Sequence, residues 1–197
     1  MTAEEFALLV QSPDRLIRQL RTAAAVSERL VPLGIVPVVA GGAAVEFYTR
    51  GSYTTVDVDM VVEGLQEIDT VLREFGFTRL AGASYVHPQI EVVVDLPDEP
   101  LAGDSRRIVE VDVDGRKVHL IGLDDIIADR LRATVYWEDL SSKEWAVQMM
   151  AAQWEQVDWT YLYALAREEP AVFAQALSEC RQLAQTVVRG TYPDEPS

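Results

Sequence analysis

The spacing of apolar residues changes several times along the first part of the chain, and each change marks a predicted element. Thr2 and Glu5 match a capping box ahead of an apolar run, which predicts a short N-terminal helix. A second helix is expected to start in the segment 12–14 (Ser-Pro-Asp), with proline at the first helical position, and to end at Gly34. The other predicted elements of this part are helices over 43–50 and 68–75 and short strands over 35–40, 56–62, 77–80, 84–86, 90–96, 108–113 and 117–121.

From Leu123 onward the apolar spacing is helical throughout, and the predicted helices begin at 123, 142, 159 and 171. The chain therefore divides into an α/β core with N-terminal helices over 1–122, a C-terminal helical subdomain over 123–190 and a frayed tail over 191–197. The predicted fold class is α/β (α+β), with a mixed sheet, flanking helices and the C-terminal helical subdomain.

Composition narrows the class of protein. Apolar residues make up 49% of the 197 positions and charged residues 25%, as in a globular protein. The 32 acidic and 17 basic side chains give a net charge of −15, which disfavours general coating of a phosphate backbone. Cys180 is the single cysteine and excludes an intramolecular disulfide or a cysteine zinc site. The longest apolar stretch, 35–45, is too short to cross a bilayer, and the start of the chain lacks a signal-peptide pattern, so we expect a cytoplasmic protein without membrane contact.

A glycine pair and two aspartates carry the candidate chemistry. Gly41 and Gly42 lie between a predicted strand and helix, where we expect their backbone N–H groups to be free to hold an anion. Asp57 and Asp59 alternate with apolar residues on the next strand, so their side chains share one face. Neighbouring carboxylates repel each other unless a cation lies between them, and magnesium prefers such oxygen ligands.

A later strand offers a further carboxylate. Glu91, Val93 and Asp95 alternate along 90–96 and are expected to share a face, so that one or both acids could join the aspartate pair. Asp112 and Asp114 repeat the same spacing, but the following Gly115 marks a hairpin turn, and we assign them to that turn.

Residues 38–50 (Val-Val-Ala-Gly-Gly-Ala-Ala-Val-Glu-Phe-Tyr-Thr-Arg) and 54–61 (Thr-Thr-Val-Asp-Val-Asp-Met-Val) resemble the nucleotidyltransferase superfamily of the polymerase-β type. The superfamily pattern is a strand, Gly-Gly or Gly-Ser, a helix, and Asp-x-Asp on the next strand. The segment 121–133 makes the chain most similar to AbiEii-type toxins of type IV toxin–antitoxin systems and their relatives. The resemblance covers about residues 35–165.

The resemblance implies a nucleotidyltransferase-like mixed sheet and a role for each motif residue. Gly41 and Gly42 would hold the phosphates of a nucleoside triphosphate, with Arg130 as a further nucleotide contact. Asp57, Asp59 and Asp95 would be the catalytic residues and the ligands of two Mg²⁺ ions, with Asp95 as the base for the incoming hydroxyl.

The same resemblance implies that a nucleoside monophosphate passes from the triphosphate to a hydroxyl on a small molecule, a protein or tRNA. It also implies a cognate antitoxin as partner if the chain is a toxin. A second hypothesis is a catalytically degenerate protein that binds a nucleotide or partner. It is favoured by two departures from the family pattern: Gly42 stands where serine is common, and Arg130 stands where several toxins have lysine.

The remaining conspicuous side chains are assigned structural roles. His87 is expected at the start of a strand and His119 on an exposed face. Glu91 could instead face solvent, Arg50 is expected to end a helix, and Cys180 is expected in the core. The tryptophans, expected to pack the C-terminal helices, are Trp137, Trp145, Trp154 and Trp159.

Overall fold

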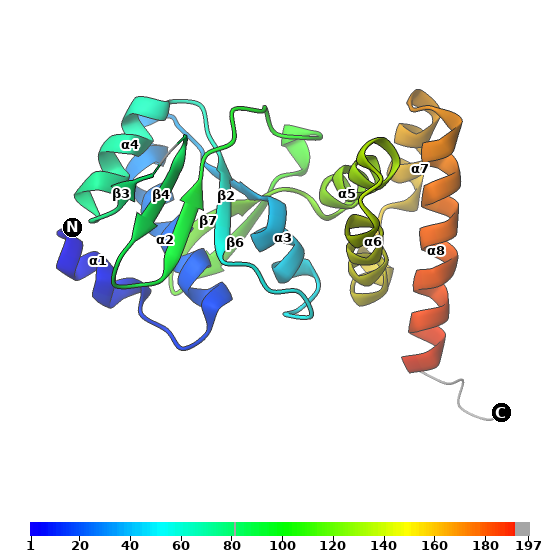
Figure 1. The fold of residues 1–197 in the computed structure, drawn as a ribbon, viewed down its shortest axis with the longest axis horizontal. Helices are drawn as coiled ribbons and strands as arrows, with labels where there is room; N and C mark the ends of the chain where they lie inside the picture. Colours follow the sequence, from blue (N-terminus) through cyan, green and yellow to red (C-terminus); the bar gives the residue numbers. More distant parts are fainter. Residues whose placement is uncertain (81, 192–197) are drawn as a thin grey trace.

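In the computed structural model, which describes residues 1–80 and 82–191, seven strands form one mixed sheet and the chain after it is helical (Figure 1). The strands are β1 (Val38–Ala40), β2 (Asp57–Val61), β3 (Thr78–Arg79), β4 (Ser84–His87), β5 (Val92–Asp95), β6 (Val109–Val113) and β7 (Arg116–Leu120). The α-helices are α1 (Ala3–Val10), α2 (Arg15–Leu30), α3 (Gly41–Tyr48), α4 (Leu65–Glu74), α5 (Leu123–Trp137), α6 (Leu140–Ala152), α7 (Trp159–Glu168) and α8 (Ala171–Thr191). Short 3-10 turns are η1 (Val31–Leu33), η2 (Ser105–Arg107) and η3 (Trp154–Gln156).

The strand order is β3-β4-β5-β2-β1-β7-β6. Strand β2 pairs in parallel with β5 and antiparallel with β1, and β1 pairs in parallel with β7. The outer pairs, β3–β4, β4–β5 and β6–β7, are antiparallel. The predicted α/β class with a mixed sheet and flanking helices is confirmed.

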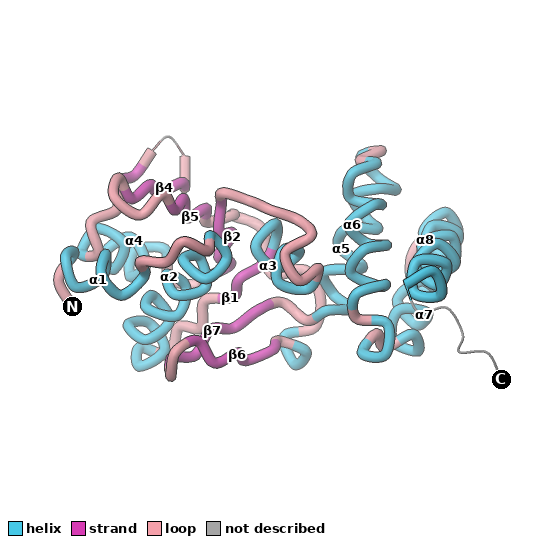
Figure 2. Tube along the Cα trace, turned by 90° about the horizontal axis from the view of Figure 1, so that it is seen from below, coloured by secondary structure: helices cyan, strands magenta, loops and turns pink. Residues whose placement is uncertain are grey.

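The two faces of the sheet pack against different helices. Val39, Val58 and Met60 face the cluster formed with α1, α2 and α4, and all three are fully buried. Val38 and Ala40 face the other way, into a second cluster formed with α3 and the C-terminal helices. In Figure 2 the strands cross the middle of the molecule, with α2 and α4 on one side and α3 on the other.

Local signals place most element ends. Thr2 and Glu5 make both hydrogen bonds of the predicted capping box. The second helix, however, starts two residues later than expected, at Arg15: Asp14 is its cap and accepts from the N–H of Ile17, so Pro13 precedes the helix. Strand β1 is also shorter than the predicted 35–40, which contains Pro37, a residue without an N–H for a ladder. Gly41 and Gly42 form the first turn of α3 instead of a separate turn.

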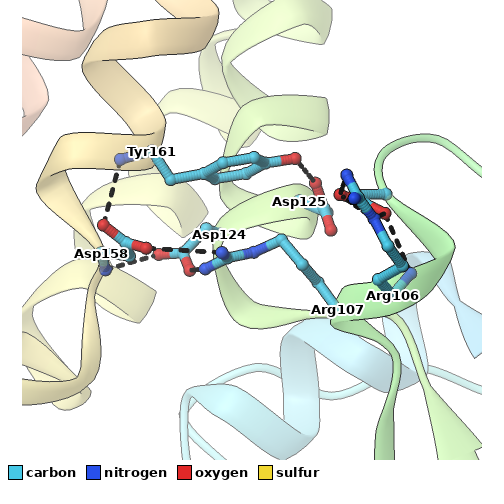
Figure 3. Close-up of polar contacts among 7 residues, drawn as sticks. Arg106, Arg107, Asp124, Asp125, Asp158 and Tyr161 are labelled. Atoms are coloured by element: carbon cyan, nitrogen blue, oxygen red, sulfur yellow. Dashed lines mark hydrogen bonds and ion pairs between the residues drawn. The ribbon is translucent and has the colours of Figure 1, made fainter.

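A partly buried polar cluster joins the loop before β6 to the C-terminal helices (Figure 3). Arg107 donates to Asp124 at the start of α5 and to Asp158, at 3.3 Å, at the start of α7. Its guanidinium lies 4.0 Å from the centre of the Tyr161 ring. The Tyr161 hydroxyl donates to Asp125 at 2.6 Å. Asp124 and Asp125 are almost fully buried. Besides placing negative charge in the first turn of α5, they hold the start of that helix against Arg107 and Tyr161.

Cys180, Trp137 and the two histidines differ in burial. Cys180 is fully buried as expected, and burial raises the pKa of its thiol to about 11. Trp137 is 72% exposed, so its predicted core position is wrong. His87 lies at the end of β4 and not at a strand start; it is buried beside the rings of Phe6 and Phe77, with Nε2 in hydrogen-bond contact with the Phe75 carbonyl. His119 is only 16% exposed, which corrects its predicted solvent position. The predicted tail lies outside the described residues over 192–197, and residue 191 still belongs to α8.

Candidate functional site

Three aspartates meet on the face of the sheet that looks toward α3. Asp57 and Asp59 alternate with buried residues along β2. Because β5 pairs in parallel with β2, Asp59 lies directly beside Asp95 and Asp57 lies beside Val93. Parallel strands in register put side chains of like parity on the same face, so the three carboxylates share it.

The carboxylates affect one another electrostatically. Burial raises the pKa of Asp57, and the charge of Asp95 raises it further. Burial also raises the pKa of Asp59, and Asp95 and Asp57 add to that rise, against the Gly42 N–H, which lowers it. One oxygen of Asp95 is buried without a hydrogen-bond partner. The face therefore carries negative charge that the protein's own donors do not balance.

The glycine pair packs directly against this cluster. The N–H of Gly42 donates to Oδ2 of Asp59 at 3.1 Å. Gly41 has φ +51°, and a Cβ added to it would lie 1.9 Å from the same oxygen. Glycine is thus required at position 41 by both backbone conformation and close approach. The expectation that both N–H groups are free is wrong for Gly42, because Asp59 accepts from it.

A second set of polar contacts holds the loop before β2. Glu46, on α3, is almost fully buried and accepts from the Thr55 N–H at 2.9 Å. Gln19, on α2, donates to the Thr55 carbonyl at 3.0 Å. The Thr55 hydroxyl in turn accepts from the N–H of Asp57 at 3.3 Å. Sequence reasoning did not assign Glu46 to the site, although a lone acid in the apolar segment Ala-Ala-Val-Glu-Phe-Tyr was a usable signal.

Arg130 reaches the site from a distant part of the chain. It lies on α5, about two helical turns beyond the start of that helix at Leu123. Helix α5 packs on α3, and the positive charge of Arg130 opposes the rise in the pKa of Asp59. Its guanidinium also pairs with the adjacent Asp129 at 2.5 Å. Glu91 does not join the cluster: it precedes β5 in a turn with φ +52° and is exposed. Asp95 is therefore the carboxylate that β5 contributes.

The donor set has the chemistry of a hard-cation site. Within the described residues, no three His, Cys, Asp or Glu side chains are gathered tightly enough to form a ready-made metal site. The carboxylates of Asp57, Asp59 and Asp95 nevertheless repel one another, and one Asp95 oxygen is buried without a donor. A divalent cation with oxygen preference fits that imbalance, because it would neutralise the carboxylates and draw them together.

Comparison with known proteins supports the fold. No protein-family model matches the chain, and no curated protein matches it by sequence. An antigenic nucleotidyltransferase-like protein from Paracoccidioides brasiliensis is similar over 85% of this chain and 94% of its own, with a TM-score of 0.54 and 18% identity. The sheet and its flanking helices thus have a nucleotidyltransferase-like fold.

Two structures of ANT(2'')-Ia are similar more loosely. The one in complex with adenylyl-2''-tobramycin has a TM-score of 0.45 and 15% identity, over 88% of this chain and 98% of that one. The solution structure has a TM-score of 0.43 and 13% identity, over 98% of this chain and 95% of that one.

Among the described residues, no helix combines the length and apolarity needed to cross a membrane.

Proposed function

We propose that this chain is a magnesium-dependent nucleotidyltransferase that moves a nucleoside monophosphate from a nucleoside triphosphate to a hydroxyl group. The observation that carries the proposal is the shared sheet face of Asp57, Asp59 and Asp95, with Gly41 and Gly42 packed against it. The Gly42 N–H balances part of the charge on Asp59, but one Asp95 oxygen is buried without a partner, and the three carboxylates still repel one another. They raise the free energy of the folded chain unless a cation binds.

The proposed reaction assigns each side chain a task. The acceptor oxygen bonds to the α-phosphorus of the triphosphate, the bond from that phosphorus to the bridging oxygen breaks, and pyrophosphate leaves with the electron pair. Asp95, whose buried oxygen has no partner, takes the hydroxyl proton. Asp57, Asp59 and Asp95 would hold magnesium, which when bound supplies charge neutralisation for the phosphates. Arg130 adds positive charge on the α5 side of the same site.

The paired arginines favour a small acceptor over a long nucleic acid. Arg21 is bound to Asp114, Arg132 to Glu169, and Arg130 to Asp129, so these side chains do not form a free basic path. With a net charge of −15, the surface offers little attraction for a polyanion such as tRNA. Action as the toxin of a toxin–antitoxin pair is the finer form of the proposal, and it rests on the resemblance over 121–133. It predicts growth arrest when the chain is expressed alone, and Asp57→Asn should relieve that arrest.

The decisive test is a titration with Mg²⁺ and each nucleoside triphosphate, followed by transfer of a radiolabelled α-phosphate to candidate acceptors. Asp57→Asn should keep the fold, because the side chains are nearly isosteric, and should reduce transfer by orders of magnitude. Asp112→Asn is a matched control, since Asp112 has the same spacing to Asp114 but accepts from the Gly115 N–H in the hairpin turn. Transfer that survives Asp57→Asn undiminished would refute the mechanism.

The alternative is a protein that binds nucleotide without turnover. It is favoured by the engagement of the Gly42 N–H with Asp59 and of Arg130 with Asp129, which leaves fewer donors for phosphate. In that case the wild type binds nucleotide, shows no transfer with any acceptor, and loses little affinity on Asp57→Asn. The same titration separates the two hypotheses.

A further inference from the structure

A pocket of about 560 Å³ opens at the edge of the sheet where β2 and β5 end and β1 begins. Segment 97–101, directly after β5, and Ser105 form one wall, and Val38 and Val61 lie on the opposite side. In Figure 1 the loop that forms this wall, in green, crosses above the upper end of the sheet. The volume lies within the range of small-molecule sites, about 300–1,000 Å³.

The pocket adjoins the carboxylate cluster on the Asp95 side. Val61 follows Asp59 by two residues on β2 and so lies on the same face, about 7 Å farther along the strand. Val38 pairs with Val61, just as Ala40 pairs with Asp59. Pro97, the first residue of the pocket wall, is two residues beyond Asp95. A molecule in the pocket would therefore lie about two residues farther along β2 and β5 than Asp59 and the proposed base Asp95.

The lining combines an apolar interior with an acidic rim. Val36 and Leu65 are 44% and 51% exposed, large fractions for apolar side chains. The charged lining residues are Glu63, Asp98 and Glu99, all exposed, and no lysine, arginine or histidine lines the pocket in the described chain. Such a rim repels a triphosphate and attracts an ammonium group. The pocket is thus electrostatically unsuited to the nucleotide and complementary to a cation with an apolar body.

We propose that this pocket holds the acceptor, and that the acceptor is a small amphipathic amine bearing a hydroxyl. Its ammonium group faces Glu63, Asp98 and Glu99, its apolar body packs on Val36 and Leu65, and its hydroxyl points toward Asp95. The inference rests on the proposed function, which it deepens by giving the acceptor a chemical class. The hydroxyl proton passes to Asp95 and the oxygen bonds to the α-phosphorus, as in the transfer reaction above.

Binding is tested first without nucleotide or metal. The probe is phenylalaninol, an aromatic amino alcohol, and its matched neutral counterpart is N-acetylphenylalaninol, both measured by ligand-observed NMR. The triple variant Glu63→Gln/Asp98→Asn/Glu99→Gln should weaken phenylalaninol binding on the order of tenfold, because three exposed charge interactions are lost. The neutral compound should bind the wild type more weakly than phenylalaninol and should not respond to the triple variant.

Two further variants separate the pocket from general charge effects. Val36→Trp fills the pocket without changing charge, and it should abolish binding of the amine. Glu144→Gln/Glu155→Gln/Glu168→Gln removes three exposed acids from the helical part of the chain and should leave binding unchanged. Failure of phenylalaninol to bind the wild type, or equal loss in the control triple variant, overturns the proposal.

Turnover is followed separately, as pyrophosphate release from each nucleoside triphosphate with magnesium and the amine present. The pocket variants should raise KM for the amine and leave KM for the nucleotide unchanged. Release that proceeds with an unchanged KM for the amine in both pocket variants overturns the pocket assignment and keeps the transfer reaction. Amine binding that both variants weaken, without any pyrophosphate release, identifies an amine site but overturns its assignment to the acceptor, and it leaves the transfer reaction to the test with other acceptors.

Discussion

Replacing Gly41 by alanine should destabilise the protein mainly through Asp59. An added Cβ would lie 1.9 Å from Oδ2, 2.5 Å from Cγ and 3.0 Å from Cβ of Asp59. Rotation of the Asp59 side chain can relieve the first two contacts, but it breaks the hydrogen bond from Gly42, worth about 1.5–3 kcal/mol for a charged acceptor. The left-handed backbone at φ +51° adds about 1–2 kcal/mol for a residue with a Cβ.

The sum predicts that Gly41→Ala lowers the free energy of unfolding by about 2.5–5 kcal/mol, a fall in Tm of roughly 10 °C for a chain of this size. Gly34→Ala is the matched control. Gly34 also has a positive φ, +81°, but nothing lies within 4 Å of an added Cβ, so only the backbone cost of about 1–2 kcal/mol is expected.

A double-mutant cycle measured by urea unfolding isolates the contact with Asp59. In the Asp59→Ala background, Gly41→Ala should cost little more than Gly34→Ala, which corresponds to a coupling of about 2 kcal/mol, well above the additivity error of about 0.5 kcal/mol. An equal cost of Gly41→Ala in both backgrounds would show that Asp59 does not lie against the glycine. The geometry of the site described above would then be wrong.

Three further predictions concern the residues around the site. Asp57→Asn should raise Tm at neutral pH without magnesium, because the folded state raises the pKa of this carboxyl and so disfavours its ionised form. In thermal melts the gain in Tm should shrink as the pH falls through that raised pKa toward the pKa of the unfolded chain, and a gain independent of pH would contradict the prediction. Arg107→Ala should lower the free energy of unfolding in urea by about 2–4 kcal/mol, because it leaves the buried Asp124 carboxylate without its main partner. The control Arg106→Ala changes an 87% exposed side chain and should cost under about 1 kcal/mol; equal losses would argue against a stabilising cluster around Arg107. Glu46→Ala should weaken Mg²⁺ binding, followed by calorimetry, because the loop before Asp57 loses its buried acceptor; unchanged affinity in a folded variant would remove Glu46 from the support of the site.

Features that depend on neighbours in sequence could be predicted from the chain alone. The capping box at Thr2 and the hairpin turn at 114–115 formed as their residue types require. The alternation of Asp57 and Asp59 with apolar residues placed both carboxylates on one face of β2, because side-chain direction along a strand has a period of two residues. The division between an early mixed sheet and later helices also followed from apolar spacing, which reports on each segment's own geometry.

The tertiary structure decided which of these segments meet. Sequence spacing left both Glu91 and Asp95 open, and only the family resemblance selected Asp95. The turn at Glu91 and the parallel pairing that sets Asp95 beside Asp59 decide which of these acids lies next to the aspartate pair. Sequence spacing also could not show that the Gly42 N–H is taken by Asp59. Nor could it show that Arg107 would fix the start of α5, and with it the position of Arg130. Strand pairing, helix packing and burial depend on contacts between residues far apart in the chain, and their free energies are set by the whole packed structure rather than by any local pattern.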